Sequence, residues 1–188
     1  LLAGLAVRDA LEPFVRGRGW RMGTKWPNDV VAVPESSTVV APVPGWASTR
    51  KIAGVLSELV TPEPSEGRTT QLAVADEGPA GRDEAPMVIL GIGVNIGQEV
   101  DDLPVAWAGS LRTLGVVDAD GDSAHAAVAE VALNAIGHQL ARRLEQWEGV
   151  CGDVDSGDGA LGRELRAALT TLGQHVSVQA PDGELSGL

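Results

Sequence analysis

The sequence has little of several features that mark common protein classes. One cysteine, Cys151, in 188 residues excludes an internal disulfide and a metal site built from several thiolates, and it fits a reducing, cytoplasmic setting. No apolar run approaches the length of about 20 residues that spans a bilayer. With 14 basic against 26 acidic residues, the net charge of −12 repels a phosphate backbone, so nucleic acid is not expected as the main partner. The apolar fraction of 44% favours a folded, globular chain.

Lysine is the scarcest charged residue, because only Lys25 and Lys51 accompany twelve arginines. Each lysine lies at an end of a predicted strand, near a turn-forming or small residue. A lysine ammonium is a compact charge with three donors, so it suits a narrow site that must neutralise one oxyanion better than a broad guanidinium does. We therefore predict a functional role, above all for Lys51. The alternative is that both are ordinary surface lysines at strand ends.

Both ends of the sequence indicate part of a longer protein. Residues 1–7 are mostly apolar, but no initiator methionine or basic leader precedes them, so they do not fit a signal peptide. Gly187 and Leu188 closely follow a turn signal. We therefore expect the chain to begin and end within a larger protein.

The hydrophobic pattern predicts helices on both sides of a group of strands, an order typical of an α+β fold rather than a doubly wound one. The most regular element is a long helix from Asp122 or Ser123 to Gly149. Its apolar stripe is predicted to run from Val128 to Trp147 and to include Val131 and Leu144. In chain order, the other predicted elements are a helix at 1–12 ended by Pro13 and the stretch 17–19, extended segments at 20–25 and 30–33, strands at 51–60, 69–74 and 87–94, a helix at 162–172, and a strand at 175–180 before a turn at 181–183.

The predicted connections are long and carry most of the acidic residues. Residues 34–49 contain several prolines and are predicted as a loop with no chemistry of its own. Residues 61–68 and 75–86 are predicted as solvated hairpin tips. Further acidic residues lie in predicted loops at 99–102, 118–122 and 153–158, so the negative charge is mainly a property of the loops and says little about the sheet.

Strand alternation predicts which residues share a face. Along 51–59, successive side chains would point to opposite faces, so Lys51 is predicted on one face and Gly54 on the other. In the later strand, the glycines of Gly91-Ile-Gly93 share a face with Asn95. Such bare backbone lets a flat ligand or another chain segment approach closely. The alternative is a bulge, or a helix packed on the two glycines.

Asn28, Asp29 and Asn95 are polar residues placed where they could line a site. Asn28 and Asp29 follow Pro27, where turn formation alone also explains them. Asn95 would offer both a donor and an acceptor at the end of its strand. From the residues alone, the structural explanation is the more common one for Asn28 and Asp29.

Three segments, taken together and in order, closely resemble the central motifs of biotin protein ligases. They are Lys25-Trp-Pro-Asn-Asp-Val30, Lys51-Ile-Ala-Gly-Val-Leu-Ser-Glu58 and Gly91-Ile-Gly-Val-Asn-Ile96. Each segment alone is a weak signal, whereas the ordered set of three is specific. The resemblance covers essentially the whole chain. It implies a mixed, largely antiparallel sheet flanked by helices at 1–172, as in class II aminoacyl-tRNA synthetase-like catalytic domains, followed by the start of an SH3-like β-barrel at 173–188.

The resemblance also implies an activity and a set of site residues. Biotin ligases of this kind use ATP and Mg²⁺ to form biotinyl-5′-AMP, and then attach the biotin to a lysine of the biotin carrier domain of a carboxylase. Lys51 matches the family lysine that contacts biotin and the phosphate, and Asp29 matches an aspartate that orients or deprotonates the acceptor lysine. The further positions carried over as lining the site are Lys25, Asn28, Gly54 and Asn95. The resemblance leaves it open whether the chain forms a homodimer.

The sequence departs from the family pattern in one respect. The family's loop rich in glycine and arginine, which closes over biotin and the adenylate, lies upstream of the first helix and is absent from these residues. We therefore expect the 188 residues alone to bind biotin poorly and to be inactive. The segments 34–49 and 75–86 are longer than the family's usual hairpins, which should alter loops and leave the site intact.

Two alternatives to a biotin ligase remain open from the sequence. A lipoate or octanoate ligase or transferase shares the fold, although the complete Trp-Pro-Asn-Asp motif favours biotin. A biotin-responsive transcriptional repressor would carry an upstream helix-turn-helix, which the upstream sequence would reveal.

Overall fold

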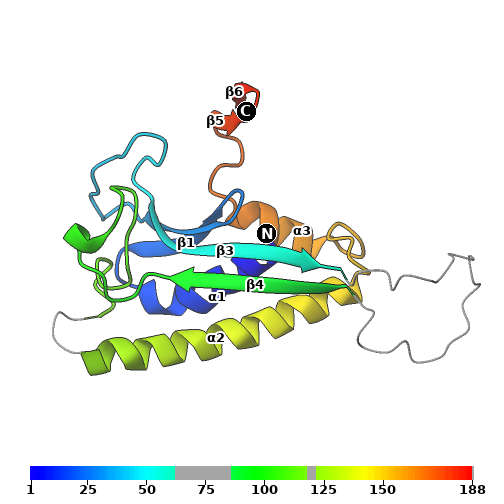
Figure 1. Cartoon of the computed structure of the whole chain (residues 1–188), viewed down its shortest axis with the longest axis horizontal. Coiled ribbons are helices and arrows are strands. Elements are labelled where there is room, and N and C mark those ends of the chain that lie inside the picture. The colour runs from blue at the N-terminus through cyan, green and yellow to red at the C-terminus, as the bar shows by residue number, and fades with distance from the viewer. Residues whose placement is uncertain (62–85, 118–121, 188) are drawn as a thin grey trace, which may run out of the picture. The chain divides into compact units, whose positions relative to one another are not determined.

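The computed structural model describes residues 1–61, 86–117 and 122–187. The chain divides into two compact units, one made of Leu1–Val55 and Ile92–Leu188, the other of Leu56–Gly91. The strand predicted at 69–74 and most of both predicted hairpin tips lie outside the described residues. In chain order (Figure 1), the elements are α1 (Leu2–Val15), β1 (Trp20–Lys25), β2 (Asp29–Pro34), β3 (Arg50–Val60), β4 (Met87–Val94), the 3-10 turn η1 (Val100–Asp102), α2 (Asp122–Gly149), α3 (Ala160–Ala168), β5 (Val176–Ala180) and β6 (Gly183–Gly187).

The main sheet has four strands in the order β1-β2-β3-β4. β1 and β2 form an antiparallel hairpin, whose register places Lys25 opposite Asp29, and β2 pairs antiparallel with β3. β2 and β3 contain several valines, which favour a pleated, half-buried strand. The predicted α+β class with an antiparallel sheet is confirmed.

The first helix is longer than predicted. α1 runs through Pro13, which therefore does not end it, and it ends at Val15, just before the predicted stop at 17–19. Proline removes one hydrogen bond to the preceding turn, which is usually costly in a helix interior. Here the last turn is held by packing instead, because Val15 is fully buried in the core.

A bulge in β3 changes which side chains share a face. The register of β2 and β3 shifts by one residue around Ile52. Ile52 and Ala53 are neighbours in the chain, yet both are buried, with exposures of 0% and 2%. The strict alternation predicted for 51–59 is therefore wrong, and Lys51 and Gly54 lie on the same outer side of β3.

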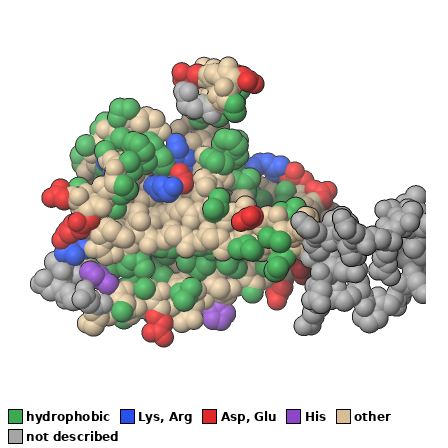
Figure 2. Space-filling model, in the orientation of Figure 1, with side chains coloured by type: hydrophobic (Ala, Val, Ile, Leu, Met, Phe, Trp, Pro, Cys, Tyr) green, Lys and Arg blue, Asp and Glu red, His purple; other side chains and the backbone are tan. Residues whose placement is uncertain are grey.

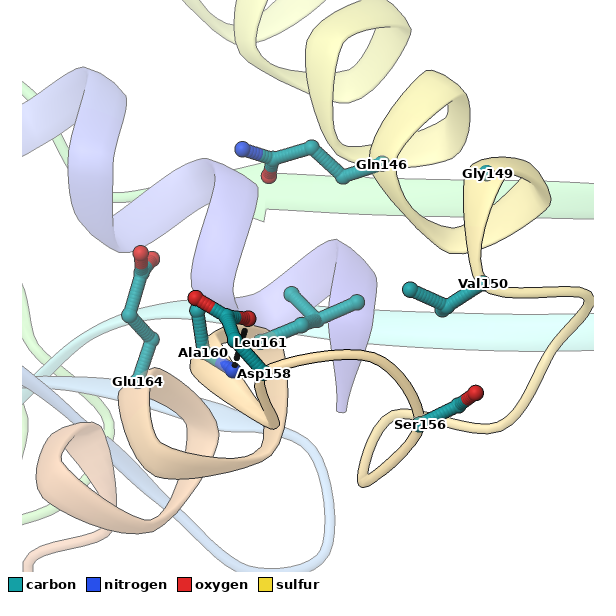
Figure 3. Close-up of a pocket in the computed structure, with 8 residues that line it drawn as sticks. All are labelled: Gln146, Gly149, Val150, Ser156, Asp158, Ala160, Leu161 and Glu164. Carbon is teal, nitrogen blue, oxygen red and sulfur yellow. Dashed lines mark hydrogen bonds between the residues drawn. The ribbon is translucent and has the colours of Figure 1, made fainter.

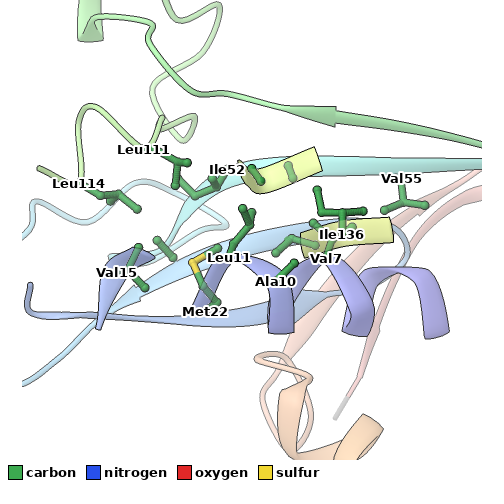
Figure 4. Packing of buried hydrophobic residues seen from close by; sticks show 14 of the residues in the cluster. Val7, Ala10, Leu11, Val15, Met22, Ile52, Val55, Leu111, Leu114 and Ile136 are labelled. Atoms are coloured by element: carbon green, nitrogen blue, oxygen red, sulfur yellow. The ribbon is translucent and has the colours of Figure 1, made fainter. Parts of the chain in front are cut away.

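The core lies between the sheet and the helices α1 and α2. Figure 4 shows Leu11 of α1, Met22 of β1, Ile52 of β3 and Ile136 of α2 converging in one cluster. Burying each such side chain contributes about 1.5 to 3 kcal/mol relative to leaving it exposed. This packing buries one face of the sheet. The polar residues of the motifs lie on the other face.

The long helix α2 has the predicted end, but only part of its predicted apolar stripe is buried. Ala132 and Ile136 have exposures of 2% and 6%, whereas Val131, Leu144 and Trp147 are 57%, 44% and 42% exposed. Val131 is one residue, and so about 100° of helix rotation, away from the buried line. Within the described ranges, no helix combines the length and apolar composition needed to cross a membrane.

A buried ion network joins α1, α2 and α3. The guanidinium of Arg143 is 3% exposed; its Nε lies 2.9 Å from Asp9 Oδ2, its Nη1 lies 2.9 Å from Gln146 Oε1, and it also pairs with Glu164. Burial alone would lower the pKa of Arg143, but the hydrogen bonds with Asp9 and Glu164 outweigh burial and raise it. Arg143 therefore stays charged and links the three helices.

The C-terminal elements differ in part from the prediction. α3 spans Ala160–Ala168 rather than 162–172. It begins early because the Asp158 side chain accepts a hydrogen bond from the Ala160 amide, at 2.9 Å. It ends early because the Thr170 amide instead bonds the Thr24 carbonyl of β1, at 2.8 Å. The predicted strand and turn after it form the antiparallel hairpin of β5 and β6, while the SH3-like barrel stays a prediction.

Candidate functional site

The first two motif segments meet at an ion pair on the outer face of the sheet. Nζ of Lys51 in β3 lies 2.5 Å from Oδ1 of Asp29 in β2, and their side chains are 36% and 13% exposed. Asp29 and Gly54 are direct partners in the register of the two strands. The structure thus brings together three predicted site residues, Lys51 and Gly54 from β3 and Asp29 from β2.

Gly54 supplies the space in which the lysine side chain lies. A Cβ placed on Gly54 would be 3.3 Å from Nζ and 3.4 Å from Cε of Lys51, and 3.9 Å from Oδ1 of Asp29. The bulge at Ile52 produces this arrangement, because it turns Lys51 and Gly54 to the same side of β3. Sequence alternation alone missed it.

We expect Gly54→Ala to displace the Lys51 ammonium while leaving the fold intact. The new methyl group would press on Nζ and Cε from a strand position with ordinary backbone angles. A small displacement of a reacting group costs activity steeply, so the activity proposed below should fall by about tenfold. Urea unfolding should give an unchanged midpoint. A variant with normal activity, or one that loses activity only by unfolding, would contradict this role for Gly54.

The backbone of Lys51 is anchored by a neighbouring segment. The Lys51 amide donates to the Trp107 carbonyl at 2.8 Å, and the Gly109 amide donates to the Lys51 carbonyl at 2.9 Å. The Asn95 side-chain amide donates to the Gly109 carbonyl at 2.9 Å. Asn95 therefore supports the segment that holds Lys51, and its amide nitrogen is already engaged in that contact.

For the two glycines of the third motif, the sequence allowed either an open platform or a bulge or packed helix. A Cβ on Gly93 would meet no described atom within 4 Å, so no helix packs on this glycine. At Gly91 the nearest contacts are with Leu56, at 3.9 Å. The structure favours the open platform over the packed helix at Gly93.

Asn28 is placed differently from the other motif residues. Asn28 is exposed in the turn between β1 and β2. Its backbone carbonyl accepts a hydrogen bond from the Val55 amide at 2.9 Å. This hydrogen bond joins the turn between β1 and β2 to β3 through the backbone. The structure does not bring its side chain into the Lys51–Asp29 pair.

Lys25 meets a loop that the sequence did not connect with chemistry. Nζ of Lys25 donates to the Gly45 carbonyl at 3.1 Å and lies 4.4 Å from the centroid of the Trp46 ring. The Trp46 ring stacks on Trp107, with centroids 5.8 Å apart and planes inclined by 9°. The loop at 34–49, which the sequence predicts to have no chemistry of its own, thus contacts a predicted site residue.

The loop is fastened at its end next to β3. The Arg50 guanidinium donates to the Ala41 carbonyl at 2.7 Å and to the Thr49 carbonyl at 2.8 Å, and burial lowers the pKa of Arg50 below its ordinary value. The Thr49 hydroxyl donates to the Trp46 carbonyl at 2.6 Å. These bonds fix the turn that carries Trp46, shortly before Lys51 in the chain.

A cleft of about 390 Å³ opens beside Lys25 and Trp46. Its other wall comes from the segment between α3 and β5, which supplies hydroxyl, amide and imidazole groups that the sequence had not marked as functional. The polar lining residues are Lys25, Thr49, Thr170, Thr171, Gln174, His175 and Ser177. No local sequence pattern identifies these residues as lining a cleft, because only the folding of the chain after α3 brings them there.

A second cleft lies away from the motifs, between the end of α2 and α3 (Figure 3). It measures about 290 Å³ and has an apolar floor that includes Val150 and Leu161. Its two carboxylates are already engaged, Asp158 with the start of α3 and Glu164 with Arg143. On the face shown in Figure 2, acidic and basic side chains lie in small separate groups, with no continuous basic surface.

The fold defined by these elements is similar to that of a biotin protein ligase. The crystal structure of biotin protein ligase from Aquifex aeolicus superposes with a TM-score of 0.54 and 16% sequence identity, covering 100% of this chain and 61% of that one. No protein-family model matches the sequence.

In sequence, the chain is similar to biotin–acetyl-CoA-carboxylase ligase of Mycobacterium tuberculosis, strain ATCC 25618 / H37Rv. The two are 28% identical over 188 aligned positions, and the match covers 98% of this chain and 48% of that protein. The resemblance indicated by the three motifs is thereby confirmed. The chain spans about half the length of this curated relative.

Proposed function

We propose that this chain belongs to a ligase that attaches biotin to a lysine of a carboxylase's biotin carrier domain, using ATP. The observation that carries the proposal is the Lys51–Asp29 ion pair beside Gly54, formed by two of the three motifs. The biotin ligase fold and the curated relative support it. The curated relative is named for biotin attachment, which favours biotin over lipoate or octanoate as the substrate.

In the first proposed step, a biotin carboxylate oxygen attacks the α-phosphorus of ATP. The new O–P bond gives biotinyl-5′-AMP, the bond to the β-phosphate oxygen breaks, and pyrophosphate leaves with the electron pair. Two anions must approach each other, so a cation placed between them lowers the barrier. Lys51 is the proposed cation, since its ammonium is partly exposed and held at a fixed place by Asp29.

In the second step, the uncharged amine of the carrier lysine attacks the acyl carbon of the mixed anhydride. The amide bond forms, AMP leaves, and the amine loses a proton. The geometry favours an orienting role for Asp29, because its carboxylate already contacts Lys51. Taking the proton from the acceptor lysine would require Asp29 to exchange that contact for the incoming amine.

Magnesium enters the proposal as part of the MgATP substrate. Among the described residues, no three histidine, cysteine, aspartate or glutamate side chains gather as a metal site. Mg²⁺ is commonly held by substrate phosphates and waters with only one or two carboxylates. The proposed location is the cytoplasm, which suits the single cysteine, Cys151.

The test is a transfer assay with the full-length protein, MgATP, labelled biotin and a biotin carrier domain. We expect label on the carrier, release of pyrophosphate, and no labelling when the acceptor lysine of the carrier is replaced. Parallel reactions with lipoate and octanoate should give no transfer. Transfer of lipoate or octanoate in place of biotin would overturn the proposal, as would absence of transfer by a folded full-length protein.

A further inference from the structure

The loop at 34–49 connects both lysines of the chain through one aromatic side chain. On one side, the Trp46 ring lies 4.4 Å from the Lys25 ammonium. On the other side, Trp46 stacks on Trp107, whose carbonyl accepts the hydrogen bond from the Lys51 amide. Trp46 therefore lies between the segment that anchors Lys51 and the charged group of Lys25.

The contacts of Lys25 differ in kind from those of Lys51. Lys51 pairs with the carboxylate of Asp29, whereas Lys25 contacts a carbonyl and an aromatic ring, which are both neutral. A carbonyl and a ring face orient an ammonium without cancelling its charge. Of the three donors of the Lys25 ammonium, the Gly45 carbonyl takes one. Lys25 thus keeps charge and donors for an anionic group in the adjoining cleft.

The Trp46 ring is held in place by its own contacts, so it can orient the Lys25 ammonium. A free lysine side chain has many rotamers, and ordering it costs up to about 2 kcal/mol. Stacking on Trp107 and the Thr49 bonds to the Trp46 carbonyl hold the ring, so the ring can restrict Lys25 before a ligand arrives. Preorganisation of this kind strengthens binding by reducing the entropy lost on association.

We propose that Trp46 is a positioning residue, whose ring, held by Trp107, fixes the Lys25 ammonium at the cleft so that it binds an anionic group of the substrate. In the proposed ligase reaction, that substrate is the nucleotide. The catalytic consequence rests on the proposed function, while the placement of Lys25 does not. The 34–49 loop then contributes to the strength of substrate binding.

The placement of Lys25 can be tested without any activity. Acetic anhydride labels free amines, and mass spectrometry can follow Lys25 and Lys51 separately on their own peptides. Trp46→Ala should speed acetylation of Lys25 by about three- to fivefold, because the ring no longer covers the amine. Trp46→Phe should keep most of the protection, and Trp147→Phe, at the far end of α2, should change nothing. An unchanged Lys25 rate in a folded Trp46→Ala protein would overturn the placement.

The catalytic consequence is tested by kinetics of the full-length protein. Trp46→Ala should raise the KM for MgATP by about fivefold and leave kcat within about twofold, with Trp46→Phe close to the native protein. In a Lys25→Ala background, Trp46→Ala should have no further effect, because its action runs through Lys25. Additive effects of the two substitutions would overturn the proposal. Absence of biotin transfer by the native protein would instead refute the ligase function and leave the labelling result intact.

Discussion

Lys51→Ala is expected to lower the rate of adenylate formation by about 100- to 1,000-fold, the largest effect of any single substitution proposed for this chain. The reaction brings a carboxylate and a phosphate together, and the Lys51 ammonium is placed to neutralise the charge that develops between them. Asp29, at 2.5 Å, and Gly54 fix its position. Single-turnover release of pyrophosphate from MgATP and biotin measures this step without the carrier.

Lys51→Arg is the matched control for charge. Arginine keeps the positive charge but spreads it over a planar group that does not fit beside Gly54 and Asp29 as an ammonium does. We expect activity between those of the native protein and Lys51→Ala. Urea unfolding should show that both variants remain folded. Unimpaired adenylate formation by Lys51→Ala would remove Lys51 from the reaction and leave it a surface lysine at a strand end.

Arg143→Ala is expected to lower the free energy of unfolding by about 1.5 to 3 kcal/mol. Arg143 is 3% exposed and bonds Asp9 of α1, Gln146 of α2 and Glu164 of α3. Its removal would leave the carboxylate of Asp9, which is 12% exposed, with only the ion pair to Arg8 at 2.7 Å. Urea unfolding followed by circular dichroism measures the change.

The neighbouring residue provides the control for Arg143. Arg142 is exposed on the same helix, so Arg142→Ala should change the free energy of unfolding by no more than about 0.5 kcal/mol. The double variant Asp9→Leu/Arg143→Met replaces the ion pair by apolar groups, and it should recover much of the loss. Equal effects of Arg142→Ala and Arg143→Ala would show that the network contributes little.

Local patterns predicted the elements whose formation depends on nearby residues. The hairpin of β1 and β2, the long helix α2 and the turn between β5 and β6 occur at or close to their predicted positions. Each rests on short-range chemistry, such as valine-rich runs, helical periodicity or a Pro-Asp-Gly turn. The ends of α1 and α3 were misplaced, because Val15 and Thr170 form contacts with distant parts of the chain that override the local signals.

The candidate site was predicted by residue type but not by geometry. Lys51, Asp29 and Gly54 were identified from motifs, yet strict alternation separated Lys51 from Gly54. The bulge around Ile52 could not be predicted, because a register shift depends on how β2 and β3 pair. The contact of Trp46 with Lys25 was missed for a similar reason, since the two residues are 21 positions apart and meet only through the folded loop.

The sequence by itself determined the chemical character of this protein, namely a chain with two lysines, each opening a motif of the biotin ligase type. Residue identity and spacing carry that information, because they specify charge, donors and turns regardless of how the chain packs. Only the tertiary structure decided which groups act together. The pairing of Lys51 with Asp29, the space left by Gly54 and the Trp46 contact with Lys25 all depend on strand register and loop path. These arise from long-range packing, which no local pattern contains.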